Sequence, residues 1–293
     1  MALYGSCVPS IDEKVQAIML ERTRYPAGVP CWVDTAQRDP RAAVAFYGGL
    51  FGWEFEDSMP PDSPVRYLLA RLRGRDVAAV GSTTDLGPPT PVWNAYISVE
   101  SADETATRVT RAGGQVITPP FDILEAGRMA VFADPAGATF CVWQPGEHKG
   151  AQLVNTPSTW NWSDLNTRDI DGAKAFYGAV FGWETSRVDF GFGESQLWRV
   201  PGYGDFLEGN DPGVRQRDRE AGAPGGFTDA IGWLQLMTSN QFRDEVPPHW
   251  SITFSVDDTD AIAERTKQLG GIVTVPPFDV AGAAKSSRSA RVR

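Results

Sequence analysis

The chain has 293 residues, of which 42% are hydrophobic and 22% are charged, and its formal net charge is −10. This length and composition are typical of a globular protein with one or two folded domains. The acidic excess disfavours nucleic acid and anionic membranes as partners, because both attract clustered lysine and arginine.

The cysteine pattern and the absence of long apolar runs indicate a cytoplasmic protein. Three cysteines, at positions 7, 31 and 141, form neither an even set nor a CxxC pair, which disfavours a disulfide framework. The first residues lack a basic start followed by an apolar run, so we expect no secretory signal. No apolar run approaches the roughly 18 residues of a membrane-spanning helix.

The first repeating unit begins with a short strand, CWVDTA from Cys31, and continues as a helix. Asp39 and Pro40 predict the helix start, as an N-cap and a proline in the first turn. The apolar positions that follow have the spacing of a helix face. They are Ala43, Phe46, Tyr47 and Leu50.

The second unit repeats this order and adds two strands. VWNAYISV from Val92 reads as a strand, Ser101 and Glu104 have capping-box spacing, and Gly113 with its following glycine ends the helix. The strands RMAVFAD and ATFCVWQ follow, joined by a turn at Asp134.

Two internal repeats show that the chain is a tandem duplication. AFYGGLFGWE from Ala45 returns as AFYGAVFGWE from Ala175, and GGQVITPPFDI from Gly113 returns as GGIVTVPPFDV from Gly270. We therefore expect an extension at 1–28, a first domain at 29–146, a linker at 147–158 and a second domain at 159–293.

The second half carries an insertion and an unusual tail. Residues 202–230 are rich in glycine and charge and predict a short helix near 215–221; they either cover the mouth of their domain or form a surface excursion without a role. After Val280 the tail AGAAKSSRSARVR lacks strand alternation. We therefore expect the fourth unit to lack its final two strands, through a natural truncation or a reading-frame change.

The AFY…FGWE segments, the double-glycine helix ends and DPAGATF from Asp134 resemble the vicinal-oxygen-chelate superfamily of glyoxalases, bleomycin-resistance proteins and dioxygenases. The resemblance covers residues 30–280. It is strongest to two-domain actinobacterial proteins labelled hydroxylase or glyoxalase-like, a type that includes a protein of daunorubicin and doxorubicin biosynthesis. It implies an α+β fold in which four βαβββ modules pair into two cup-shaped mixed sheets, the last module incomplete, with a ligand inside the cup.

The resemblance also places the metal ligands of the superfamily, and this chain lacks them. The corresponding positions hold Trp32, Asn94, Trp162 and Ser251 on first strands and Cys141 on a last strand. None is a histidine or a carboxylate, which metal sites of this kind need in number. His249 shares the strand face of Ser251, but one ligand does not make a site, and we expect His148 to be solvated in the linker. We therefore expect no metal and no cofactor.

A Trp-x-Asp pattern remains in both halves, as Trp32 with Asp34 and Trp162 with Asp164. Residues two apart on a strand point to one face, which in the resemblance is the cup. The tryptophan then offers a surface for a planar ligand, and the aspartate accepts hydrogen bonds or serves as a base. The alternative is that each tryptophan fills core space and each aspartate bonds to backbone. The buried thiol of Cys141 is expected to be inert.

The leading functional hypothesis is metal-independent binding of a planar or apolar small molecule, such as an aromatic polyketide. By family resemblance, this suggests an accessory protein in anthracycline-type antibiotic biosynthesis that assists an oxidation step beside a partner oxidising enzyme. One alternative is an enzyme of glyoxalase, isomerase or hydroxylase type that uses Asp34 or Asp164 as a general base. Another is a drug-sequestering resistance protein. The expected ligand-binding residues are Trp32, Asp34, Asn94, Cys141, Trp162, Asp164, His249 and Ser251.

Overall fold

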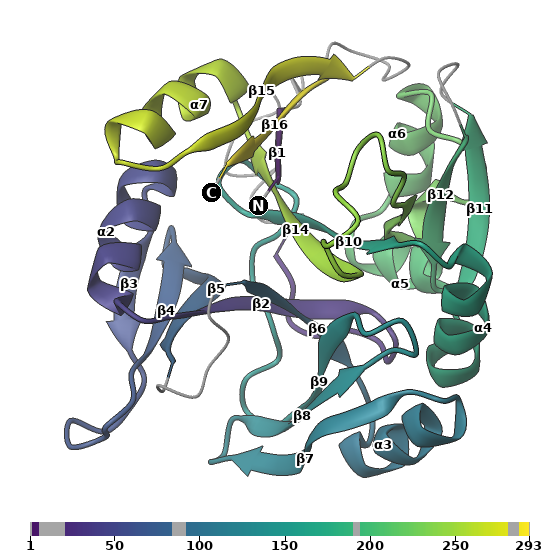
Figure 1. The fold of residues 1–293 in the computed structure, drawn as a ribbon, viewed down its shortest axis with the longest axis horizontal. Helices are drawn as coiled ribbons and strands as arrows, with labels where there is room; N and C mark the ends of the chain where they lie inside the picture. Colours follow the sequence, from purple (N-terminus) through teal and green to yellow (C-terminus); the bar gives the residue numbers. More distant parts are fainter. Residues whose placement is uncertain (1, 6–20, 84–91, 190–193, 281–286, 293) are drawn as a thin grey trace.

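Two mixed eight-stranded sheets, each flanked by helices, make up the computed structural model of the chain (Figure 1). The structure describes residues 2–5, 21–83, 92–189, 194–280 and 287–292. Among these residues, no helix is both long and apolar enough to cross a membrane. The α+β class and the repeated modules expected from the sequence are confirmed.

The first sheet contains the first two modules, which meet where β2 and β6 pair antiparallel. Its strand order is β3-β4-β5-β2-β6-β9-β8-β7. The first module comprises β2 (Pro30–Gln37), α2 (Pro40–Phe51), β3 (Glu54–Asp57), β4 (Tyr67–Leu72) and β5 (Arg75–Ser82). The second comprises β6 (Trp93–Ser98), α3 (Ala102–Arg111), β7 (Gln115–Ile123), β8 (Gly127–Ala133) and β9 (Thr139–Pro145).

The second sheet has the order β11-β12-β13-β10-β14-β1-β16-β15 and includes a strand from the other end of the chain. The third module comprises β10 (Trp160–Thr167), α4 (Ile170–Phe181), β11 (Glu184–Asp189), β12 (Glu194–Arg199) and β13 (Ala230–Leu236), with α5 (Tyr203–Asn210), α6 (Val214–Glu220) and the 3₁₀ turn η1 (Phe227–Asp229) inserted. The fourth comprises β14 (His249–Val256), α7 (Thr259–Gln268), β15 (Val273–Val280) and β16 (Ser287–Val292), and the extra strand is β1 (Ala2–Gly5).

The expectation that the fourth module lacks its final two strands is wrong for one of them. The tail forms β16, which pairs antiparallel with β15. The remaining place is filled by β1, which lies between β14 and β16. The sequence pattern missed both β1 and β16. Each is held by backbone hydrogen bonds to two neighbouring strands, and the alternation of side chains along a strand does not reveal such pairing. The extension at 1–28 therefore contributes to the second sheet.

The helix boundaries follow the predicted capping signals. The Asp39 side chain accepts a hydrogen bond from the Ala42 amide at 3.0 Å, and Asp169 accepts one from Gly172 at 2.8 Å in the repeated module. Both helices end at a glycine in the left-handed region, Gly52 at φ 71° and its repeat at φ 72°. The duplicated sequence thus forms the same local structure twice.

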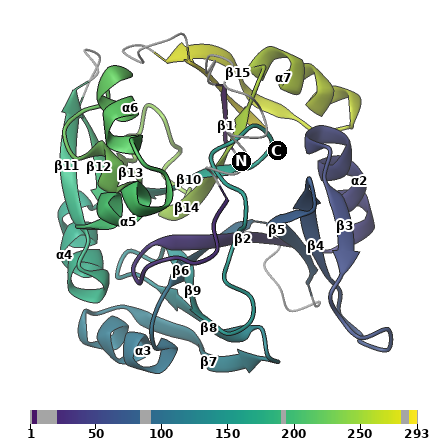
Figure 2. The same cartoon turned by 180° about the vertical axis from the view of Figure 1, so that it is seen from behind.

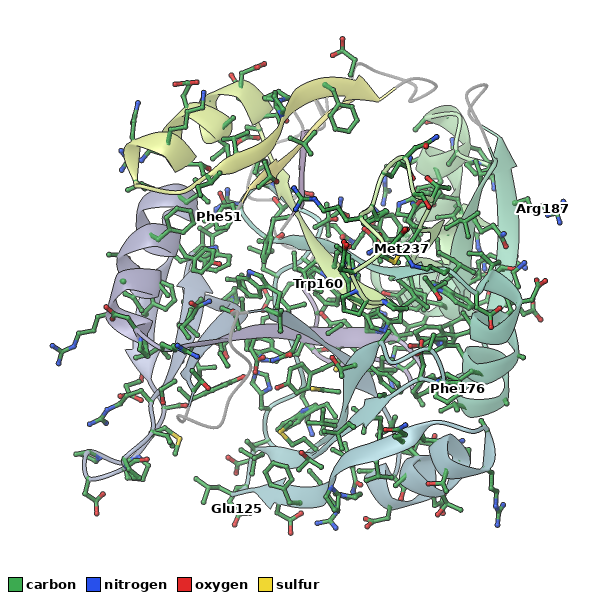
Figure 3. The ribbon with its side chains drawn as sticks, viewed as in Figure 1. Phe51, Glu125, Trp160, Phe176, Arg187 and Met237 are labelled. Carbon is green, nitrogen blue, oxygen red and sulfur yellow. The ribbon has the colours of Figure 1, made fainter. Side chains whose placement is uncertain are left out.

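The two halves share one continuous core. Helix α2 contacts α7 and helix α3 contacts α4, so the first module lies beside the fourth and the second beside the third (Figure 2). Phe51 of α2 packs against Phe254 of β14, with ring centroids 5.2 Å apart, and Phe176 of α4 lies toward α3 (Figure 3). A shared framework therefore supports both sheets. The side of each sheet that carries its Trp-x-Asp pair, Trp32 with Asp34 or Trp162 with Asp164, is called its concave face below.

Candidate functional site

The first concave face brings four of the predicted residues together. In the register of β2 and β6, Asp34 lies opposite Asn94 and Trp32 lies opposite Tyr96. In the register of β6 and β9, Tyr96 lies beside Cys141. Because residues opposite one another in a sheet share a face, Trp32, Asp34, Asn94 and Cys141 all belong to this surface.

Asp34 is the centre of a hydrogen-bond network on this face. Its Oδ2 atom accepts hydrogen bonds from the hydroxyls of Tyr67, at 3.0 Å, and Tyr96, at 2.7 Å. Its Oδ1 atom accepts one from the Asn94 amide at 2.8 Å. The Trp32 indole in turn donates to the Tyr67 hydroxyl at 2.9 Å. Sequence reasoning missed both tyrosines, although Tyr96 lies two residues from Asn94 on the predicted strand.

The network is buried, and burial shifts the pKa values of its ionisable groups. Asp34 is 5% exposed; burial raises the pKa of its carboxyl, and the three donated hydrogen bonds oppose that rise. Burial raises the pKa of the Tyr67 and Tyr96 hydroxyls and of the Cys141 thiol, and the nearby Asp34 charge adds to each rise. The tyrosines therefore act as donors, and Cys141 stays a protonated thiol.

His148 is only partly exposed and packs against the first sheet, contrary to the expectation of a solvated linker residue. Its ring meets Trp32 edge-on with centroids 4.5 Å apart, and its buried Nε2 atom has no hydrogen-bond partner among the residues that the structure describes. Burial lowers the pKa of the imidazole, which favours its neutral form. The expectation failed because the segment after β9 does not run free: the Ala151 amide donates to the Cys31 carbonyl at 2.8 Å, which draws this segment across the start of β2.

The second concave face collects the remaining predicted residues. In the register of β10 and β14, Trp162 lies opposite Thr253, Asp164 opposite Ser251, and the residue opposite His249 is Asn166. The Asp164 carboxylate accepts hydrogen bonds from the Thr253 hydroxyl at 3.1 Å and from the Trp233 backbone amide at 3.0 Å. The Asn166 amide donates to the Ser251 hydroxyl at 3.0 Å. These side chains form a polar row along β10 and β14, made of Asp164, Asn166, Ser251 and Thr253.

An aromatic group lies beside the polar row. Trp162 meets Phe227 edge-on with centroids 5.9 Å apart and Trp233 with centroids 6.4 Å apart. All three are partly buried and pack on a small apolar cluster separate from the main core. That cluster contains Val188, Leu197 and Ala230. Phe227 belongs to the insertion, which therefore contributes to the concave face of its own sheet.

The two faces differ in exposure. On the first, Trp32 and Asp34 are 4% and 5% exposed. On the second, Trp162 and Asp164 are only partly buried. The first face therefore resembles a sealed polar core, whereas the second presents aromatic and polar side chains to solvent.

The residues on these faces do not fit the metals that related folds use. Within the described part of the chain, no three histidines, cysteines or acidic residues gather as a metal site requires. The carboxylate of Asp34 already accepts three hydrogen bonds from its neighbours. His249 makes its Nδ1 contact with the Pro247 carbonyl, at 2.8 Å.

Comparisons with known proteins agree with this fold. A model of the Glyoxalase/Bleomycin resistance protein/Dioxygenase superfamily matches residues 32–142 and 159–288. The chain is 37% identical over 264 residues to putative glyoxylase CFP32 of Mycobacterium bovis, covering 89% of this chain and 90% of that protein. It is 32% identical over 270 residues to anthracycline biosynthesis protein DnrV of Streptomyces peucetius, covering 88% and 87%.

Solved structures resemble the fold at low sequence identity. The Mn(II)-bound glyoxalase from Novosphingobium aromaticivorans superposes with a TM-score of 0.51 at 17% identity, covering 86% of this chain and 74% of that one. The 2,3-dioxygenase LapB from Pseudomonas sp. KL28 superposes with a TM-score of 0.51 at 11% identity, covering 87% and 85%. These matches concern architecture alone.

Proposed function

The chain belongs to the glyoxalase/bleomycin resistance protein/dioxygenase superfamily, and on this premise we propose that it binds a planar or apolar small molecule on the concave face of the second sheet. The observation that carries this proposal is the partly exposed group of Trp162, Trp233 and Phe227 beside the polar row of Asp164. Small-molecule sites are usually lined by apolar and aromatic side chains together with a few fixed polar groups.

Each part of this face has a physical role in the proposed complex. The indole rings of Trp162 and Trp233 contribute large apolar area for stacking against a planar ligand. The buried cluster under them keeps the rings in place, so little side-chain entropy is lost on binding. Asp164 and Ser251 provide hydrogen-bonding groups for the polar edge of the ligand.

We further propose an accessory role in antibiotic biosynthesis, in which an aromatic polyketide is held for a partner oxidising enzyme. Support comes from DnrV and from DauV of a Streptomyces strain, whose names assign them to anthracycline biosynthesis and which are 32% and 33% identical to this chain. The proposed activity uses no metal, because Trp32, Asn94, Trp162, Ser251 and Cys141 occupy the ligand positions.

Calorimetric titration with a tricyclic anthraquinone tests the binding proposal. We expect Trp162→Ala to weaken binding by about tenfold or more, since the stacking contact and its buried area are lost. Leu124→Ala is a matched control, because Leu124 is 75% exposed on the turn after β7 in the other sheet. An unchanged dissociation constant in folded Trp162→Ala protein, or no binding by the wild-type chain, would contradict the proposal.

A further inference from the structure

One strand position is filled differently in the two sheets. In the first sheet, β6 pairs in parallel with β9, which continues from β8 and pairs antiparallel with it. In the second, β14 pairs in parallel with β1, and β1 pairs antiparallel with β16. Strand β1 thus takes the place of β9, although it lies at the opposite end of the sequence from its neighbours (Figure 2).

We propose that the place between β14 and β16 is a strand acceptor, and that a second copy of this chain can fill it with its own N-terminal strand. The paired segments are Ala2–Gly5 with 253–256 on one side and with 288–291 on the other. None of these pairings requires β1 to be joined to β14 or β16 by a short loop. An identical strand from a second copy would therefore form the same hydrogen bonds, which is the condition for domain swapping.

Strand β1 and the next described segment of the chain lie beside different halves of the protein. The next described residue, Glu21, pairs with Leu153 beside the first half, whereas β1 lies within the second sheet. Donor and acceptor are thus not parts of one hairpin. Whether the strand is donated in cis or in trans then depends on the protein concentration relative to the effective concentration within one chain.

The acceptor also has a strong physical requirement for an occupant. Phe254 and Val256 on β14 are 0% and 2% exposed, so the strand with which β1 pairs is part of the core. Removing β1 would leave backbone donors and acceptors unpaired on β14 and β16. The acceptor is therefore rarely empty, and we expect exchange to occur during refolding rather than in the folded monomer.

Engineered disulfides between register partners test the exchange. Leu3 lies opposite Ala290, so in a Cys7→Ser background one full-length chain carries Leu3→Cys and a second carries Ala290→Cys. The two chains are refolded together from denaturant, oxidised and analysed on non-reducing gels with peptide mapping. We expect a disulfide-linked heterodimer whose yield rises with protein concentration. Leu124→Cys in place of Ala290→Cys is the control for random pairing of exposed cysteines.

Two results would overturn the proposal. A heterodimer yield no higher than that of the Leu124→Cys control, with a chain carrying both cysteines closing only on itself, would show that the strand is donated in cis alone. No disulfide in either arrangement would show that this place does not hold residues 2–5. Full-length Leu3→Pro provides an independent readout: amide exchange should rise in 253–256 and stay unchanged in 96–98, the equivalent segment of β6.

Discussion

The ring of Phe176 lies directly against the backbone of Gly114, so that a Cβ atom at this glycine would come within 2.7 Å of the Phe176 Cε2 atom. The same arrangement recurs in the other pair of modules, where a Cβ atom at Gly271 would come within 2.7 Å of the Phe46 Cε2 atom. Each phenylalanine belongs to an AFY repeat and each glycine to a double-glycine helix end. The two repeated motifs are thus paired across the halves, the second module with the third and the first with the fourth.

Substituting Gly114 should disrupt this junction. Gly114→Ala places a methyl group 2.7 Å from Phe176 and 2.8 Å from the Ala133 carbonyl oxygen, so we expect the free energy of unfolding to fall by about 1–3 kcal/mol. Urea denaturation measures the change. The control is Gly209→Ala in α5, where nothing lies within 4 Å and stability should stay the same or rise. Equal effects of the two substitutions would contradict the packing described.

A hydroxyl group also joins the halves. Tyr177 donates a hydrogen bond to Asp134 at 3.2 Å and accepts one from the Trp250 indole at 3.0 Å, and both partners are buried. We expect Tyr177→Phe to lower the free energy of unfolding by about 1–3 kcal/mol, because buried polar groups lose their partner. Its repeat, Tyr47→Phe, should have the smaller effect, since the Tyr47 hydroxyl bonds to the half-buried Trp93 at 3.2 Å. The reverse order in thermal or urea unfolding would refute this account.

The residues at the candidate metal positions lead to a prediction about the metal content of the purified protein. Because Trp32, Asn94, Cys141, Trp162 and Ser251 occupy them, the purified chain should contain far less than one iron, manganese, nickel or zinc ion per molecule. Elemental analysis after dialysis checks this. A chelator should leave anthraquinone binding unchanged. One tightly held divalent ion per chain, whose removal abolishes binding, would instead favour the metalloenzyme activities of the superfamily.

Local signals in the sequence predicted the fold because they act over a few residues. Asp39 and Ser101 cap the helices that their spacing indicates, and the repeats identify four modules. The Trp-x-Asp pattern predicted that each tryptophan shares a sheet face with its aspartate for the same reason, since strand periodicity alone puts both side chains on one surface. Such inferences need no knowledge of which strands are neighbours.

The rest depended on pairing between distant segments. Tyr67 joins the Asp34 network because β4 lies two strands from β2, which no local pattern reveals. His148 packs on Trp32 because the segment after β9 crosses the start of β2. Strand β1 reaches the second sheet from the far end of the sequence. In each case the signal lies in tertiary contacts rather than in periodicity or capping.

The raised pKa of the buried Asp34 carboxyl leads to a prediction about how the stability of the protein depends on pH. Burial raises its pKa above the ordinary value of 3.8, so the folded chain binds a proton more tightly than the unfolded chain does. The contribution of this group to stability is therefore fully present below about pH 3.8 and is lost as pH rises through the folded pKa. Asp34→Asn removes the titration while keeping a similar shape.

We therefore expect the stability of Asp34→Asn, relative to wild type, to increase as pH rises from about 4 to 7. Asp103→Asn is the control of opposite sign, because its hydrogen bond with Arg128 lowers the pKa of Asp103. The contribution of Asp103 is present above its unfolded pKa and is lost as pH falls through its folded pKa, so Asp103→Asn should lose relative stability as pH rises through the acid range. Urea midpoints across this pH series measure both trends. A flat difference for Asp34→Asn would show that the three hydrogen bonds from Tyr67, Tyr96 and Asn94 cancel the effect of burial.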